Sequence, residues 1–174
     1  MRTLALTTFL MVVFGLVGCA NPSVVRVNDV ELGKLTVQKI FVPRFEGNPE
    51  FIEESTDFFI AELGPRISAS IIQGSVLRTE STDVLSGGNL APTEIGIAKA
   101  KEVGAQVLVM GKVTSHHTSG MLNGFSTIRV INVANGEILA SFHRPSGLLI
   151  AHSEHQCVME AVSRTAKDLA KALK

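Results

Sequence analysis

The 174-residue sequence has no tryptophan, no tyrosine and only two cysteines. Without Trp and Tyr the chain lacks the usual platforms for stacking on sugar rings, which leaves nine Phe residues for that role. Basic and acidic side chains number 16 each, and the sequence contains no basic run. Because nucleic-acid binding depends on Lys and Arg side chains that neutralise phosphates, this balance predicts no nucleic-acid partner.

An uncharged apolar run from Leu4 to Val17 follows the basic residue Arg2 and precedes Gly18-Cys19. This order of a charged, an apolar and a small-residue region is typical of an export signal. A membrane-spanning helix needs about 20 apolar residues, so a retained membrane helix is the weaker interpretation. The sequence therefore predicts a signal peptide over residues 1–18 that is removed from the mature protein.

The passage Leu16-Val17-Gly18-Cys19 resembles the lipobox of bacterial lipoproteins. The resemblance implies cleavage before Cys19, diacylglycerol on its thiol and acylation of its new amino group. Several acyl chains on one residue hold a protein stably in a lipid bilayer. Sorting rules for such lipoproteins treat Asp after the cysteine as an inner-membrane signal. This chain has Ala20 and Asn21 there, so we expect it in the outer membrane, facing the periplasm.

Once Cys19 carries lipid, only Cys157 remains, so no intramolecular disulfide can form. The stability of the fold must then come from its apolar core. We expect a tether over residues 19–33, which could instead end in an edge strand, and one domain over residues 34–174.

The first part of this domain has the pattern of a strand followed by a helix. Residues 34–45 are rich in β-branched and aromatic side chains, which favours a strand. Asn48-Pro49 is typical of a helix start. Apolar residues then recur every four positions, which predicts one helical face: Phe59, Leu63, Ile67 and Ile71. Because this stripe passes through Pro65, we expect a helix kinked there, with two short helices as the alternative.

The middle of the domain has the pattern of two strands separated by a helix. Residues 75–79 form a short candidate strand. Residues 92–103 have the pattern of a helix that ends at Gly104. Residues 106–115 open with a continuous apolar run, which is typical of a strand buried on both faces. We expect this strand to lie in the middle of the sheet.

The last part of the domain has the pattern of a hairpin and a helix. Residues 125–133 and 137–142 form two candidate strands joined by Asn135-Gly136, a strong hairpin signal. Ser153 can cap the last helix. The apolar face of this helix is formed by Cys157, Val158, Ala161, Val162, Leu169, Ala170 and Leu173. The complete order βαβαβββα predicts an α/β single-domain sandwich, a mixed β-sheet with about three helices packed on it.

The candidate metal ligands are His152, His155 and Cys157, with His116-His117 elsewhere in the chain. Zinc accepts imidazole and thiolate ligands. The spacing in the first group, however, places these side chains on different faces of a helix, and Cys157 falls on the apolar face. We therefore favour exposed histidines and a buried thiol, and predict no metal and no cofactor.

The sequence also lacks a convincing catalytic motif. Gly87-Gly88 has neither the Lys of a P-loop nor the spacing of a dinucleotide-binding loop, and no nucleophile elbow is present. Glu53-Glu54 are adjacent on one predicted helix, where a solvated face is commoner than an acid/base pair. The sequence therefore predicts a protein that is not an enzyme and works by binding.

Two passages resemble one superfamily of envelope proteins. They are Lys39 to Phe45, a first strand ending in phenylalanine, and Gly104 to Thr114, which continues into the strand around Asn135 to Leu139. With the element order, they resemble the superfamily shared by the periplasmic domain of CsgG, the N-terminal domain of TolB and the penicillin-binding-protein activator LpoB. The resemblance implies a docking or oligomerising module in envelope assemblies, with no catalytic residues.

Three functional hypotheses follow. The first is a non-catalytic outer-membrane lipoprotein that binds an envelope protein partner, alone or as a homo-oligomer. The second is an LpoB-like activator of a penicillin-binding protein. The third, from a different class, is a metal-binding or hydrolytic periplasmic protein that uses His152 and His155.

Overall fold

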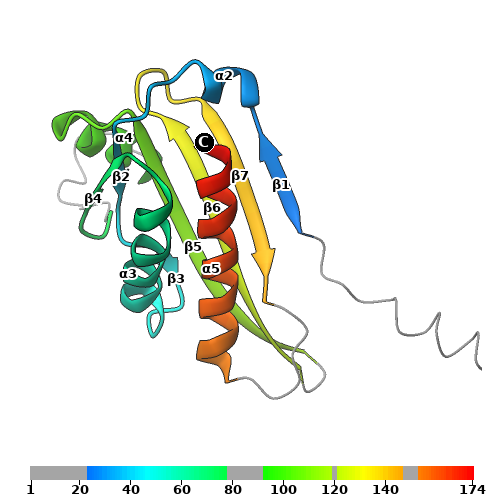
Figure 1. Ribbon diagram of the computed structural model, residues 1–174. Helices are drawn as coiled ribbons and strands as arrows, with labels where there is room; N and C mark the ends of the chain where they lie inside the picture. Colours follow the sequence, from blue (N-terminus) through cyan, green and yellow to red (C-terminus); the bar gives the residue numbers. More distant parts are fainter. Residues whose placement is uncertain (1–22, 78–91, 119–120, 147–152) are drawn as a thin grey trace, which may run out of the picture.

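The computed structural model describes residues 23–77, 92–118, 121–146 and 153–174, which form a mixed β-sheet with helices on both faces (Figure 1). Within these ranges the sheet has seven strands, six of them in the order β1-β7-β6-β5-β2-β4, while β3 pairs with β5. The predicted α/β sandwich with a mixed sheet is confirmed. The predicted leader and Cys19 lie outside the described residues.

The sheet combines an antiparallel half with a parallel half. Strands β5 (Val107–Thr118), β6 (Met121–Asn132), β7 (Ile138–Pro145) and β1 (Val24–Val27) pair antiparallel in that order. On the other side of β5, strand β2 (Lys39–Val42) pairs parallel with β5 and with β4 (Ser70–Gln73). The two-residue strand β3 (Glu46–Gly47) also pairs parallel with β5. As predicted, β5 is therefore an interior strand.

The predicted hairpin joins β6 and β7. The loop between them contains Gly136, which has a φ of 77°, a left-handed conformation that favours glycine. The Oδ1 atom of Asn135 accepts a hydrogen bond from the backbone N–H of Glu137 at 3.1 Å, which supports the turn. Asn135-Gly136 therefore forms part of the hairpin turn, as the sequence predicted.

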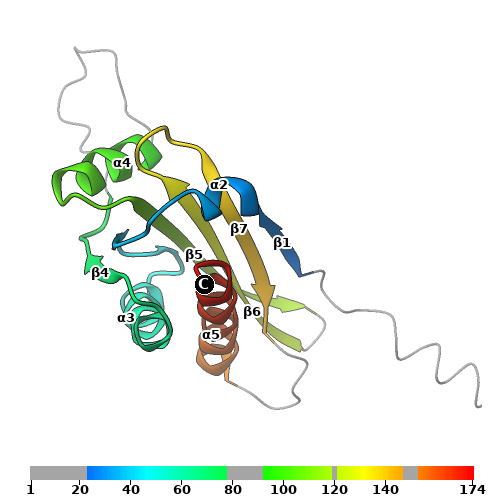
Figure 2. The same cartoon turned by 45° about the horizontal axis from the view of Figure 1, so that its top comes forward.

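The helices cover the two faces of the sheet unequally (Figure 2). Helices α3 (Ile52–Leu63) and α5 (Glu154–Ala172) pack on one face, whereas α4 (Pro92–Glu102) packs on the opposite face at one end of the sheet. The main core lies under α3 and α5, where Phe59, Val162 and Leu169 are fully buried. A smaller apolar cluster lies under α4.

Helix α5 begins and packs as the sequence predicted. The Ser153 side chain accepts a hydrogen bond from the backbone N–H of Gln156, and the Gln156 side chain accepts one from the backbone N–H of Ser153. This reciprocal capping box satisfies two backbone donors at the helix start. Of the predicted apolar face, all residues are buried except Leu173, which is half-buried.

The predicted tether is wrong where the structure describes it. Residues 24–27 form the edge strand β1, in which Val27 lies opposite Ala140 of β7, and residues 29–33 form the short helix α2 (Asp29–Gly33). The alternative of an edge strand is correct for residues 24–27, although the segment ends in helix α2 and not in the strand. Val27 packs against the main core, so the strand adds apolar contacts as well as hydrogen bonds.

The predicted start of the first long helix is also wrong. Asn48 begins a turn, because its carbonyl accepts the N–H of Phe51 at 3.0 Å, and α3 begins only at Ile52. The Asn48 side chain does not cap the helix. Instead, its Nδ2 donates to Ser115 Oγ on β5 at 2.8 Å, a partner far away in the sequence.

The kinked helix predicted through Pro65 is not formed. Helix α3 ends at Leu63, Gly64–Arg66 forms a 3₁₀ turn, and Ile67 is already extended. Ile71 therefore lies in β4 and not on a helix. The strand predicted over residues 75–79 is wrong for residues 75–77, which are not a strand, and residues 78–79 lie outside the described part. The four-residue spacing misled because Ile71 reaches the same core from the sheet.

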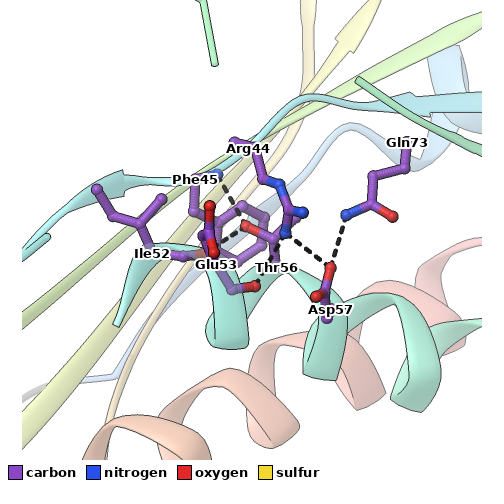
Figure 3. A network of polar contacts seen from close by, with 7 residues as sticks. All are labelled: Arg44, Phe45, Ile52, Glu53, Thr56, Asp57 and Gln73. Carbon is purple, nitrogen blue, oxygen red and sulfur yellow. Dashed lines mark hydrogen bonds and ion pairs between the residues drawn. The ribbon is translucent and has the colours of Figure 1, made fainter. Parts of the chain in front are cut away.

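A polar network holds α3 against the sheet (Figure 3). Asp57 Oδ1 accepts hydrogen bonds from Arg44 Nη1 at 2.7 Å and from Gln73 Nε2 of β4 at 2.6 Å. The buried Thr56 hydroxyl accepts the backbone N–H of Phe45 at 3.0 Å and donates to the carbonyl of Ile52 at 2.7 Å. These bonds join strand β4 and the segment that follows β2 to the first turns of α3. In the described part of the chain no helix is long and apolar enough to cross a membrane.

Candidate functional site: the open face of the sheet

Part of the sheet face under α4 carries no helix in the described structure. Helix α4 covers only the end of this face, where Leu108 and Ile131 are buried. Beyond that end, alternate residues of four strands point to the same side and are exposed or half-buried. We define the open face as Val24 and Arg26 of β1, Lys112, Thr114 and His116 of β5, Asn123, Phe125, Thr127 and Arg129 of β6, and Ser141 and His143 of β7.

The open face carries positive charge without acidic neighbours on its own strands. Strands β1, β5, β6 and β7 contain no Asp and no Glu. Arg26, Lys112 and Arg129 are exposed, and no ion pair joins them to a carboxylate of the described residues. Arg144 lies on the other face, where its Nε contacts Asp168 Oδ2 of α5 at 2.6 Å. The uncompensated cations of these strands therefore gather on one side.

The strand register fixes the spacing of these cations. Arg129 of β6 lies opposite Ser141 of β7, and Ser141 lies opposite Arg26 of β1. Since neighbouring strands are about 4.8 Å apart, the backbones of Arg129 and Arg26 are separated by roughly 10 Å. Lys112 of β5 lies opposite Thr127, two residues from Arg129 on β6. The three cations are thus spread over the width of four strands.

A row of three rings crosses the open face beside these cations. The Phe125 ring is stacked on His143, with 5.7 Å between centroids and an interplanar angle of 15°. On its other side, Phe125 contacts His116 at 5.4 Å in a tilted arrangement. Thr127 Oγ1 and His143 Nδ1 are 2.8 Å apart, a hydrogen bond that orients the imidazole. The open face therefore combines a row of aromatic rings with cations and short hydroxyl side chains.

The structure separates the predicted metal ligands that it describes. His116 lies on the open face, and its neighbour His117 points to the opposite side because successive strand residues alternate. His155 Nε2 pairs with Glu54 Oε2 of α3 at 2.7 Å, while its ring contacts Phe51. His152 lies outside the described residues. Among the described residues, no group of three His, Cys, Asp or Glu side chains is arranged to hold a metal ion.

Cys157 is a buried free thiol, as the sequence analysis favoured. Its Sγ lies 3.7 Å from the carbonyl oxygen of Leu122 on β6, so it packs between α5 and the sheet. This environment suits a small apolar side chain better than a nucleophile. Of the adjacent acids Glu53 and Glu54, the second is engaged with His155. That the protein is not an enzyme remains a prediction.

Sequence analysis missed most of the open face. It singled out His116 but not its partners Phe125 and His143, which lie 9 and 27 residues further along the chain. A signal was present, because acidic residues are absent from all four strands while basic residues recur. Which of those basic residues share a side depends on the strand register, and the register is a property of the folded sheet.

No known protein-family model matches the sequence, and no curated protein matches it either. Solved structures do match. A variant PelC dodecamer from Paraburkholderia phytofirmans is 13% identical, with a TM-score of 0.57 over 88% of this chain and 98% of that chain. A second PelC dodecamer from the same organism is 10% identical, with a TM-score of 0.55 over 83% and 95%. The LpoB C-terminal domain from Salmonella enterica is 17% identical, with a TM-score of 0.49 over 67% and 87%. The chain therefore shares the fold of these PelC structures over 83% to 88% of its length.

Proposed function

We propose that this protein is a non-catalytic lipoprotein of the bacterial cell envelope that acts as a self-assembling docking module. The observation that carries the proposal is the pair of sheet edges. Strands β1 and β4 end the sheet, each has four residues, and neither pairs with a further strand of the described chain. Unpaired edges present backbone N–H and C=O groups that favour addition of another strand.

The directions of the two edge strands fit a head-to-tail assembly. Strand β1 runs antiparallel to β7, and the pairings across the sheet make it antiparallel to β4 as well. Strand β1 of one copy can therefore extend the sheet of the next copy at β4 as an antiparallel pair. Val24 and Val25 of β1 are 41% and 44% exposed, and pairing would bury part of this apolar surface.

The likeness to PelC supports an assembly of many copies. PelC forms a dodecamer in both solved structures, and its chain is matched almost completely by this one. Head-to-tail contacts close into rings when the rotation between neighbours allows it. We propose a ring-like homo-oligomer for this chain on that basis.

The proposed anchor is the acylated Cys19, in the outer membrane with the domain facing the periplasm. Cys19 precedes Val24 by five residues, which span at most about 18 Å when extended. Strand β1 would therefore stay close to the bilayer. Such an anchor concentrates copies on one membrane, which favours weak edge contacts between them.

The assembly is tested on acylated protein purified in detergent, by measuring its mass with light scattering after size exclusion. We expect a large oligomer for the unchanged chain and a shift toward monomer for Val25→Lys, because Lys on an edge strand opposes further pairing. Val30→Lys is the matched control, since Val30 is 68% exposed and lies on α2, outside the edge strand. A monomeric unchanged chain, or equal behaviour of both variants, would contradict edge assembly.

The docking partner is tested by mild crosslinking in cells and capture of the tagged lipoprotein, with Cys19→Ala as the unanchored control. Capture of a secretion or envelope-assembly protein supports the docking role. Capture of a penicillin-binding protein would instead favour the LpoB-like activator. Stoichiometric zinc in the purified protein would revive the metal-binding hypothesis.

A further inference from the structure

The open face includes the first described strand after the predicted anchor. Val24 and Arg26 belong to the open face, and they lie on β1, the first strand after Cys19. Val24 lies opposite His143, whose ring stacks on Phe125. Val24, which lies opposite His143 of the ring row, and Arg26, the nearest cation, therefore follow Cys19 by only five and seven residues of chain.

We propose that the open face lies against the anionic phospholipid surface of the membrane that holds Cys19. The inference rests on the lipid anchor of the proposed function, but its charge argument is independent of that anchor. Arg26, Lys112 and Arg129 are exposed on one side of four strands that contain no acidic residue. A surface of this kind is attracted to phosphate headgroups.

The shape of the open face favours a lipid surface over a protein partner. Its three cations are spread over about 14 Å, the width of four neighbouring strands, rather than gathered around an apolar centre. A stable protein interface usually has an apolar core, whereas the exposed apolar side chain here is Val24, with Phe125 half-buried beside it. Mobile lipid phosphates can adjust to such dispersed cations. Phe125 and Val24 would sit at the headgroup level, where partly apolar rings and side chains are tolerated.

The attraction of the open face to an anionic membrane is expected to be strong for a protein already anchored there. Each Lys or Arg near an anionic surface improves the partition about fivefold, so three cations together give on the order of 100-fold. The anchor removes the cost of bringing the protein to the bilayer, and the open face then needs only to set its orientation. The attraction is expected to weaken with added salt, because salt screens exposed charges.

The orientation is tested with acylated full-length protein reconstituted into lipid vesicles. A neutral bimane fluorophore is attached to Ser141→Cys, which lies between Arg129 and Arg26, in a Cys157→Ala background. The control carries the same fluorophore at Ala61→Cys, an exposed position of α3 on the other side of the sheet. Quenching by neutral acrylamide is compared between phosphatidylcholine vesicles and vesicles that also contain phosphatidylglycerol.

We expect phosphatidylglycerol to reduce quenching at position 141 about threefold or more and to leave position 61 unchanged. Replacing Arg26, Lys112 and Arg129 together by Gln should abolish this protection. The matched variant replaces Lys34, Lys167 and Lys171 by Gln, three exposed cations off the open face, and should keep it. Circular dichroism confirms that both triple variants are folded.

Equal quenching in the two kinds of vesicle, or equal loss of protection in both triple variants, would overturn the proposal. Protection by soluble polyglutamate but not by phosphatidylglycerol would identify an acidic protein segment as the partner and also refute the membrane orientation. The anchor is checked separately, by the mass of the acylated Cys19 peptide and by resistance of the bound protein to alkaline extraction. Failure of the anchor is therefore distinguishable from failure of the orientation.

Discussion

A buried hydroxyl pair between the sheet and α5 offers a sharp test of how the fold is held together. Ser126 of β6 and Thr165 of α5 are both fully buried, and their hydroxyl oxygens are 3.0 Å apart. Thr165 Oγ1 also lies 2.9 Å from the carbonyl oxygen of Val162, to which it donates its hydrogen bond. Ser126 then donates to Thr165. The chain of bonds therefore runs from the sheet into the helix backbone.

Because of this direction of hydrogen bonding, removing the Thr165 hydroxyl should destabilise the protein more than removing the Ser126 hydroxyl. Thr165→Val removes the acceptor of Ser126 and leaves its hydroxyl buried without a partner, which costs about 1–3 kcal/mol in the free energy of unfolding. Ser126→Ala leaves Thr165 bonded to the Val162 carbonyl, so we expect a smaller loss of about 0.5–1 kcal/mol. The double variant has no orphaned hydroxyl. It should therefore be clearly more stable than the sum of the two losses predicts.

The free energies are measured by urea unfolding of the acylated protein in detergent, followed by circular dichroism. The slope of the free energy of unfolding against urea concentration should be the same for the unchanged protein, the two single variants and the double variant. All four expose the same surface area when they unfold. Losses that simply add, or a larger loss for Ser126→Ala than for Thr165→Val, would refute the proposed direction of the hydrogen bonds.

Four further substitutions test the packing, the helix cap and the polar network by the same urea measurement. Gly124→Ala places a Cβ against the backbone of Cys157 and should cost about 3 kcal/mol, whereas Gly33→Ala meets no atom within 4 Å and should be nearly neutral. Ser153→Ala removes the cap of α5 and should cost about 1 kcal/mol, and a loss below a few tenths would contradict the capping box. Asp57→Ala breaks the bonds to Arg44 and Gln73, but since the Asp57 side chain is 59% exposed we expect a loss below about 1 kcal/mol. A loss as large as that of Gly124→Ala would show that this network contributes more than a surface pair.

The sequence was most informative where one local signal decided the structure. Asn135-Gly136 predicted the hairpin because few residues adopt a positive φ, and Ser153 predicted the start of α5 because its hydroxyl satisfies free backbone donors. The continuous apolar run that opens β5 predicted an interior strand, since both of its faces are covered. Each of these signals lies within a few residues of chain.

The sequence was misleading where a distant partner decided the structure. Asn48 has the side chain of a helix cap, but Ser115 on β5 takes its amide. Ile71 continues a helical stripe, yet the parallel pairing of β4 with β2 brings it to the core as a strand residue. The segment before residue 34 has no regular pattern, and only the free edge of β7 makes part of it a strand. Local propensity gives way in these places because long-range contacts contribute more free energy.

By itself the sequence determined the class of the fold, its last hairpin and last helix, and the prediction of a lipid anchor at Cys19. Only the tertiary structure decided which basic side chains share a face. Arg26, Lys112 and Arg129 come from three strands separated by long stretches of chain, and a shift of one residue in any pairing would turn its cation to the other side. The open face exists because α5 covers one side of these strands and α4 reaches only the end of the other.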